Sequence, residues 1–363
     1  MTNTTTHRVG LDVHANQTHI CALDPATGEV SRRRVKGPPE AVLPFLEELG
    51  KGMIAAYEAG PTGLLLARAG KERGLDVRVI ATGLIPKAPG DKVKTDRRDA
   101  ERLARLLAAG ELHFAWVPSL EEEHFRDLVR CRDDLRGDRM RARHRIGKLL
   151  LRHGLRYPGP GANWTQRHHE WLGRLHFSDP AAQTTFIDYL AAIQGLDQRA
   201  GVLEARIAEL AESGSYASTI ARLRCFRGID TLSAAGLCAE IGDFRRFAKA
   251  PQLAGYLGIT PSEWTSDERR RQGAITKAGP SHARRLLVEA AQHSGRRPKL
   301  SPWLRARQEG QDPRVCEISW RAQRRLHARW LHLRERRGKP GGKVIIACAR
   351  ELSCFLWEAA TLD

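Results

Sequence analysis

The stretch Arg8-Val-Gly-Leu-Asp-Val13 decides the fold of the N-terminal part of the chain, because it places one acid inside an otherwise apolar run. A short apolar run of this kind predicts a buried β-strand. A carboxylate that is buried without a partner is costly, so Asp12 needs a hydrogen-bond partner or a metal ion. Asp12 is therefore the first candidate functional residue.

The segments that follow this strand predict a mixed sheet with helices. The predicted strands cover residues 8–13, 19–23, 30–35, 53–57 and 77–81, and the predicted helices cover 38–49 and 61–72. In a sheet with this β-β-β-α-β-α-β order, the first and fourth strands can lie side by side. A further helix, which starts near Thr95, completes a domain that we place at residues 1–115.

Three more acids stand at positions where they could meet Asp12. Glu58 ends the fourth strand, and Asp96 and Asp99 are three residues apart at the start of the helix near Thr95, where they share one face. Clustered carboxylates raise one another's pKa, whereas two Mg²⁺ ions would hold all four ionised and could clamp both oxygens of a phosphoryl transfer. This order of acids is that of a ribonuclease-H-like nuclease core.

Each acid also has a structural interpretation when it is taken alone. Asp96 and Asp99 could complement the dipole at a helix N-terminus, Asp12 could accept from a backbone amide, and Glu58 could cap the following helix. Sugar kinases and actin-like ATPases also begin with a strand Asp, but they need a Gly-rich turn directly after it. Here Val13-His-Ala15 follows, and there is no GxxxxGK[ST] motif, so small-molecule phosphotransfer is the weaker hypothesis.

The middle and last thirds of the chain are predicted to be helical. An Arg-dense helical block runs from Pro118 to about Arg156, and a second helix carries apolar residues at alternating steps of three and four, which predicts a coiled-coil seam. The seam residues are Phe186, Tyr189, Ile193, Leu196, Ala200, Leu203, Ile207 and Leu210. We place a helical spacer at residues 116–215 and a mostly helical domain at 216–363.

An Arg-rich polar segment, predicted as a loop over 262–273, contains two hydroxyls beside three cations: Thr265, Ser266, Arg269, Arg270 and Arg271. Arginine forks suit phosphate oxygens, and a serine beside them could attack a phosphodiester. A serine in a polar loop is more often a solvated turn residue, so residue types alone leave both interpretations open.

The net charge indicates a polyanionic partner. The 363 residues include 60 Lys and Arg against 42 Asp and Glu, which gives +18 and a pI near 10.1. We expect nucleic-acid binding that weakens steeply with salt. The seven Cys form no CxxC pair, and there is neither a secretory signal nor a bilayer-length apolar run, so we expect a cytoplasmic protein.

Several segments, taken in order, resemble the insertion-sequence transposases of the DEDD type that carry a serine in their C-terminal domain, whose studied members are bridge-RNA-guided recombinases. The segments are Gly10-Leu-Asp-Val-His-Ala15, Tyr57-Glu-Ala-Gly-Pro-Thr-Gly63, Lys94-Thr-Asp-Arg-Arg-Asp-Ala100, Leu257-Gly-Ile-Thr-Pro-Ser-Glu263, Gly273-Ala-Ile-Thr-Lys-Ala-Gly279 and His282-Ala-Arg-Arg-Leu-Leu-Val-Glu-Ala-Ala291. The fold class implied is α/β plus α, with a ribonuclease-H-like (RuvC-like) N-terminal domain, a helical coiled-coil spacer and a mostly helical C-terminal transposase domain.

The resemblance implies a role for each acid and for the serine. Asp12, Glu58, Asp96 and Asp99 would bind Mg²⁺, and Ser266 would form a covalent phosphoserine link to DNA. The family commonly has Gly after that serine, where this chain has Asp267, so Thr265 stays an alternative nucleophile.

The partners implied are donor and target DNA, a structured guide (bridge) RNA and further copies of the chain, as a dimer or tetramer. The expected nucleic-acid-binding residues are Arg269, Arg270, Arg271, Lys277, Arg284 and Arg285. The function implied is RNA-guided DNA strand exchange by an insertion sequence. The alternatives are a metal-dependent junction nuclease in which water is the nucleophile, and an architectural nucleic-acid binder without catalysis.

Overall fold

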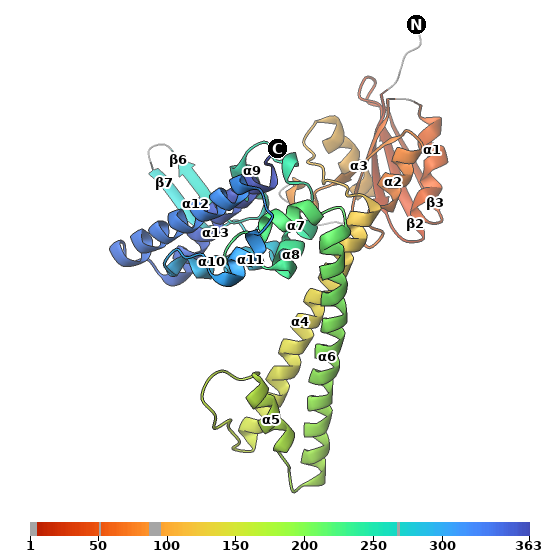
Figure 1. Ribbon diagram of the computed structural model, residues 1–363. Helices are drawn as coiled ribbons and strands as arrows, with labels where there is room; N and C mark the ends of the chain where they lie inside the picture. Colours follow the sequence, from red (N-terminus) through yellow and green to blue (C-terminus); the bar gives the residue numbers. More distant parts are fainter. Residues whose placement is uncertain (1–5, 51, 87–95, 267–268) are drawn as a thin grey trace. The chain divides into compact units, whose positions relative to one another are not determined.

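The chain forms two compact units in the computed structural model, residues 1–118 and residues 119–363 (Figure 1). The structure describes all residues except 1–5, 51, 87–95 and 267–268. Each unit is described by itself below. The division into three domains at residues 115 and 215 stays a prediction.

The first unit is built on a five-stranded mixed sheet of order β3-β2-β1-β4-β5. Its strands are β1 Arg8–Val13, β2 Gln17–Leu23, β3 Val30–Lys36, β4 Ile54–Glu58 and β5 Asp76–Ile80. β1 pairs antiparallel with β2 and parallel with β4. The predicted adjacency of the first and fourth strands is confirmed.

Alternate residues of β1 face two different layers of helices, as the two-residue period of a strand requires. Val9 and Leu11 are buried in a cluster with Leu43, Leu46 and Leu66 of α1 (Leu43–Glu48) and α2 (Leu65–Glu72). The other face packs against α3 (Asp96–Ala108), whose Ala100 and Ala104 contact Cys21 of β2. Two short 3₁₀ turns, η1 (Pro39–Val42) and η2 (Thr82–Leu84), join these elements.

Two long helices form a hairpin at the start of the second unit (Figure 1). They are α4 (Leu120–Arg152) and α6 (Pro180–Ser213), and the short α5 (Gln166–Arg174) lies near their far end. Ser119 and Glu122 make a capping box that starts α4. In α6, every residue of the predicted seam is buried or half-buried, with Phe186, Ile193, Ala200 and Ile207 spaced seven residues apart.

Helices from the rest of the chain pack into one large apolar core. They are α7 (Ala217–Leu223), α8 (Thr231–Ile241), α9 (Ala250–Tyr256), α10 (Ser281–Ala291), α11 (Pro302–Gln308), α12 (Pro313–Leu331) and α13 (Gly341–Ala360), with 3₁₀ turns η3 (Phe244–Arg246) and η4 (Gln292–Gly295) and the π-helical turn η5 (His332–Arg336). Among the described residues, no helix combines the length and the apolar character needed to cross a bilayer.

The prediction of a loop over 262–273 is wrong. This segment is a two-stranded antiparallel ribbon, made of β6 (Pro261–Ser266) and β7 (Arg269–Ile275), that projects from the helices (Figure 1). The backbone N–H and C=O groups of each strand pair with those of the other strand, which satisfies their hydrogen bonds. The sequence lacks the alternating apolar residues that indicate a strand, and for this reason the segment was predicted as a loop.

Candidate functional site

The sheet register brings Asp12 and Glu58 onto neighbouring strands. Leu11 of β1 pairs with Tyr57 of β4, and Asp12 and Glu58 are the next residue along each strand. Because β1 and β4 are parallel, their carboxyl ends meet at the same edge of the sheet. The two strand-borne acids are thus brought together, as the order of elements predicts.

Gly10 explains why α3 can pack directly on β1. A Cβ atom built on Gly10 would lie 2.0 Å from the carbonyl oxygen of Ala100 and 2.5 Å from the amide nitrogen of Ala104. The backbone of α3 therefore occupies the space that a side chain would need. Asp12 is two residues after Gly10, so it faces the same side of the sheet as α3.

Glu58 belongs to this face as well. It is two residues after Ala56, which pairs with Gly10 and is buried in a cluster with Leu103 of α3. The face covered by α3 thus holds both strand-borne acids. These contacts fix α3 over the face of the sheet that carries Asp12 and Glu58.

The two remaining acids lie on the first turn of α3. Asp96 is the first residue of the helix, and its side chain lies outside the described part of the structure; Asp99 is half-buried one turn later. Among the side chains that the structure does describe, no group of three or more His, Cys, Asp or Glu is close enough to hold a metal ion. Whether the four acids form one metal site therefore stays a prediction.

Sequence reasoning missed two histidines beside Asp12. His14 Nε2 lies 3.2 Å from Asp12 Oδ2, and His19 is the residue directly opposite Asp12 on β2. An imidazole at this distance can orient a carboxylate by donating a hydrogen bond. The signal was present in the sequence, because a tight turn at 14–16 fixes the pairing of β1 with β2.

The β6–β7 ribbon places the candidate nucleophile at its tip. Ser266 is the last residue of β6 and pairs with Arg269, and Thr265 pairs with Arg270. The side chains of these four residues, and the whole of Asp267, lie outside the described part of the structure. The pairing itself brings each of these two hydroxyl-bearing residues opposite an arginine.

The next pair of the ribbon is fully described. Trp264, which is 69% exposed, pairs with the exposed Arg271. A Cβ on Gly273 would lie 2.8 Å from the Trp264 ring, so the missing side chain there leaves room for the indole. The ribbon therefore presents an aromatic and a cationic group close to Ser266 along the chain.

The other three predicted nucleic-acid contacts have different surroundings. Lys277 is exposed after the ribbon, whereas Arg284 donates hydrogen bonds to the carbonyl oxygens of Leu257 (2.9 Å) and Ala278 (2.7 Å). Arg285 donates to Asp133 and Glu289. Arg284 and Arg285 thus brace α10 against neighbouring segments, and a role for them on nucleic acid stays a prediction.

A buried ion-pair network joins α4, α8 and α10 within the second unit. The Glu240 carboxylate, 3% exposed, accepts two hydrogen bonds from Arg130 (2.9 and 2.8 Å) and lies 3.3 Å from His282 Nδ1. Burial acts to raise the pKa of Glu240, but the hydrogen bonds from Arg130 and His282 outweigh it and lower this pKa to about 2. Glu240 is therefore ionised at neutral pH and holds the three helices together.

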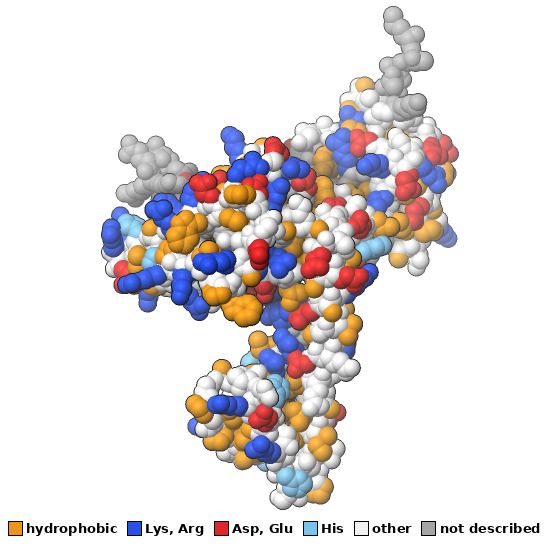
Figure 2. All heavy atoms as spheres, viewed as in Figure 1, with side chains coloured by type: hydrophobic (Ala, Val, Ile, Leu, Met, Phe, Trp, Pro, Cys, Tyr) orange, Lys and Arg blue, Asp and Glu red, His pale blue; other side chains and the backbone are white. Residues whose placement is uncertain are grey.

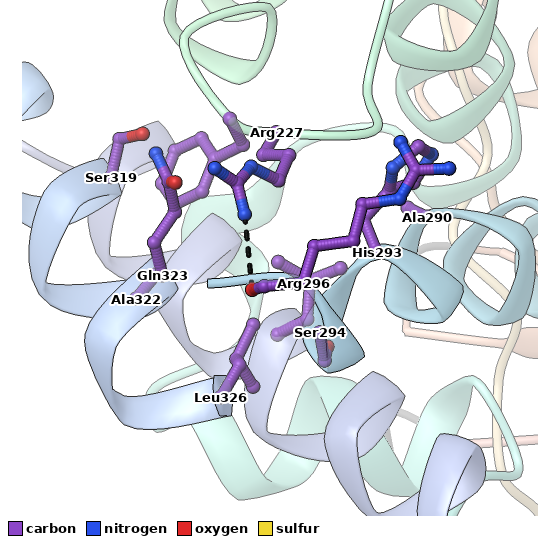
Figure 3. Close-up of a pocket in the computed structure, with 11 residues that line it drawn as sticks. Arg227, Ala290, His293, Ser294, Arg296, Ser319, Ala322, Gln323 and Leu326 are labelled. Carbon is purple, nitrogen blue, oxygen red and sulfur yellow. Dashed lines mark hydrogen bonds between the residues drawn. The ribbon is translucent and has the colours of Figure 1, made fainter. Parts of the chain in front are cut away.

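A small cavity lies between the C-terminal helices and is lined by Arg227, His293 and Gln323 among others (Figure 3). Its volume of about 20 Å³ suits one water molecule. Within the described part of the chain, the buried amide nitrogen of Gln323 has no hydrogen-bond partner there, and Arg227 donates to the carbonyl oxygens of Arg296 and Lys299. We interpret this cavity as a structural water site.

Comparison with known proteins identifies the family. The sequence matches the IS116/IS110/IS902 transposase family over residues 220–308 and the DEDD transposase domain of the IS110 type over residues 9–154. The chain belongs to the IS110 family of insertion-sequence transposases. The mixed sheet and the DEDD domain are together consistent with the expected ribonuclease-H-like fold.

Full-length relatives support this assignment. A putative transposase of Sinorhizobium fredii, y4qE, is 42% identical over 84% of this chain and 74% of its own length. The transposase for insertion sequence element IS1533 of Leptospira borgpetersenii is 33% identical over 91% and 97% of the two chains. A probable family 20 transposase of Pseudomonas aeruginosa is 28% identical over 78% and 82%.

Proposed function

We propose that this IS110-family transposase exchanges DNA strands through a covalent link to Ser266, with Mg²⁺ held by Asp12, Glu58, Asp96 and Asp99, and with a structured guide RNA selecting the DNA. The observation that supports the proposal is the parallel pairing of β1 with β4, which brings Asp12 and Glu58 to neighbouring strands on the face that α3 covers. The runner-up is a nuclease in which the same acids act and water replaces the serine.

The donor set fits the proposed metal. Carboxylate oxygens from rigid strands and one helix turn are the ligands that Mg²⁺ prefers, whereas a zinc site would call for Cys or additional His. When bound, Mg²⁺ would supply positive charge to the phosphoryl oxygens and lower the pKa of an attacking hydroxyl. The neighbouring His14 would hold the Asp12 carboxylate in a fixed orientation.

The proposed step conserves the phosphodiester bond. The Ser266 oxygen forms a bond to phosphorus, its proton passes to a base, and the bond from phosphorus to the leaving strand breaks with return of a proton to that strand's hydroxyl. Attack by a hydroxyl of a new strand reverses these events and frees the serine, so no ATP is needed. Arg269, which pairs with Ser266, and Arg271, two residues further along the same strand, would stabilise charge on the phosphoryl oxygens.

The remaining parts of the proposal concern partners and architecture. The net charge of +18 supports binding to DNA and to a guide RNA. The seven-residue spacing of buried positions in α6 supports a coiled-coil spacer between two catalytic parts. The family resemblance supports a dimer or tetramer in which the serine of one copy meets the acids of another copy. Action on DNA would place the protein at the nucleoid of a prokaryotic cell.

Two matched hydroxyl variants test the nucleophile. Purified transposase with its co-purifying RNA and Mg²⁺ is incubated with labelled DNA, and protein–DNA adducts are counted after denaturation. We expect Ser266→Ala to abolish the adduct and strand exchange, and Thr265→Ala to retain both. Adducts that persist in Ser266→Ala but vanish in Thr265→Ala would move the nucleophile to Thr265. DNA cleavage without any adduct would instead establish the nuclease.

Variants of the acids test the metal-binding role independently. Asp12→Asn should abolish cleavage and exchange at every Mg²⁺ concentration while DNA binding persists, since the neutral amide binds Mg²⁺ poorly. Retained cleavage in Asp12→Asn would contradict the proposed site. Sequencing of the RNA that co-purifies with the protein tests the guide, and an absence of RNA encoded beside the insertion sequence would refute that part.

A further inference from the structure

A pocket at the far end of the α4–α6 hairpin combines aromatic rings with positive charge. Its volume is about 520 Å³, within the roughly 300–1,000 Å³ of small-ligand sites. Its lining includes the rings of Tyr157, Trp164 and Trp171 and the cations Arg143, Lys148 and Arg156. Figure 2 shows hydrophobic, basic and histidine side chains together over this lobe.

A buried histidine in this pocket has an unsatisfied polar atom. His168 is 3% exposed, and its Nδ1 has no hydrogen-bond partner among the residues that the structure describes. Its ring centroid lies 5.0 Å from those of Tyr157 and Trp164 and 5.5 Å from that of Trp171. A buried polar atom without a partner is destabilising, so a ligand that supplies the missing hydrogen bond would be bound favourably.

The protonation state of His168 follows from its surroundings. Burial lowers its pKa, and interactions with the neighbouring His169 and Arg143 lower the pKa further. The imidazole is therefore neutral at pH 7, with one nitrogen that donates and one that accepts. Such a ring can pair with the edge of a nucleobase, which carries donors and acceptors of both kinds.

Trp164 is held in a strained conformation beside an incompletely bonded cation. Its φ of +70° lies in the left-handed region, which a bulky residue rarely adopts. The Arg143 guanidinium lies 4.7 Å from the Trp164 ring centroid, and Nη2 lies 3.9 Å from Asp197. The buried Nε of Arg143 has no hydrogen-bond partner among the described residues. Strain of this kind is typical of ligand-binding positions.

The Tyr157 ring is accommodated by the absence of a side chain nearby. A Cβ atom on Gly159 would lie 2.3 Å from the Tyr157 hydroxyl oxygen. The chain between α4 and α5 thus folds closely over this ring. The Tyr157 and Trp164 rings thus present flat aromatic surfaces in a segment that contains little regular secondary structure.

We propose that this pocket binds an unpaired nucleotide of a single-stranded nucleic-acid segment, with its base on the aromatic rings and its phosphate on the basic side chains. Aromatic rings stack on the face of any base, and Arg and Lys bind phosphate. No acid is present among the lining residues that the structure describes. A paired base has both faces covered by its neighbours, so a duplex would not offer the surface that these rings need.

The inference concerns binding at a site far along the chain from Asp12 and Ser266, and so it holds whether or not Ser266 is the nucleophile. RNA and DNA both provide a base and a phosphate, and the experiment distinguishes them. The probes are 12-nucleotide strands with one 5-bromouracil, prepared as single-stranded RNA, as single-stranded DNA and as the corresponding DNA duplex.

Photo-crosslinking to the full-length protein, followed by mass spectrometry of peptides, locates the contact. We expect the single-stranded probes to crosslink within residues 140–171. Whichever of the RNA and DNA strands gives the higher crosslinking yield identifies the nucleic acid that the pocket binds. Crosslinks in this segment from the duplex alone, or none in it from either single strand, would overturn the proposal.

Two charge-matched double variants test the cations. Lys148→Ala with Arg156→Ala removes two charges from the pocket, whereas Arg152→Ala with Arg167→Ala removes two charges from exposed positions of the same hairpin outside it. We expect about tenfold weaker binding of the single-stranded probe for the first pair and little change for the second. Equal losses would refute a specific pocket.

A ring-conserving substitution tests the stacking. Trp164→Leu should weaken single-strand binding about tenfold, and Trp164→Phe should restore most of it, because a phenyl ring still stacks. Circular dichroism of both variants confirms that α4 and α6 remain folded. Equal binding by the Leu and Phe variants would contradict stacking at this position.

Discussion

Gly10→Ala should separate α3 from the sheet, and the size of the effect follows from the contacts. The new methyl carbon would lie 2.0 Å from the Ala100 oxygen and 2.5 Å from the Ala104 nitrogen, and both are backbone atoms. Real Cβ contacts essentially never fall below 3.0 Å, so α3 must move by at least about 1 Å (3.0 − 2.0). No side-chain rotation can relieve a clash of this kind.

Overpacking of this severity costs about 1–3 kcal/mol, and the backbone clash places Gly10→Ala at the upper end. With 1.4 kcal/mol for each factor of ten, the opening equilibrium of α3 should rise about 5- to 150-fold. A shift of 1 Å in a positioned catalytic group can lower the rate about 100-fold. The variant should therefore lose most metal-dependent activity while DNA binding persists.

Hydrogen–deuterium exchange over residues 96–108 measures the opening of α3 without reference to activity. Gly83→Ala is the matched control, since a Cβ there has open space and no left-handed φ to strain. We expect faster exchange in α3 for Gly10→Ala and unchanged exchange for Gly83→Ala. Wild-type exchange together with full activity in Gly10→Ala would refute the close packing of α3 on β1 and the positioning of Asp99 that depends on it.

Two predictions concern stability within the second unit. Ser119→Ala removes the hydroxyl that accepts a hydrogen bond from the amide of Glu122 (3.2 Å). The substitution should lower the free energy of unfolding, measured by urea titration, by about 1 kcal/mol. An unchanged urea midpoint would contradict the capping box. Because the pKa of Glu240 falls from 4.5 to about 2 on folding, its stabilisation should be complete above about pH 4.5 and disappear as the pH falls towards 2. Glu240→Gln should remove this contribution to the pH dependence of stability and lower the free energy of unfolding by about 1.5–3 kcal/mol at neutral pH. An unaltered acid-unfolding transition would show that Arg130 and His282 do not hold the carboxylate.

The sheet and its acids were predictable because burial imposes a pattern on the sequence. β1 and β4 are apolar runs that each contain or end on one acid, and the order of elements restricts which strands can be neighbours. The five strands of the sheet agree with the predicted ranges to within two residues at each end. Apolar strands of this length leave few alternatives, which is why the adjacency of Asp12 and Glu58 followed from residue order.

The β6–β7 ribbon was not predictable by the same reasoning. Its strands read Pro261-Ser-Glu-Trp-Thr-Ser266 and Arg269-Arg-Arg-Gln-Gly-Ala-Ile275, which lack an apolar face because the ribbon packs little against the core. Its stability comes from cross-strand pairing, which a single sequence does not display. The contact of His14 with Asp12 is different, because the tight turn at 14–16 that positions His14 could have been read from the sequence.

Arginine content alone also misjudges which cations are available to nucleic acid. In α4, Arg132 pairs with Glu204 and Arg139 with Asp197, both on α6, so part of the Arg-dense block joins the two long helices. These pairs are partly exposed and each adds little stability. If each of the 42 acids neutralised one cation, 18 of the 60 Lys and Arg would still lack an acidic partner. The structural pairs therefore redistribute the positive charge without removing the surplus, and a surplus of this size favours binding to a polyanion.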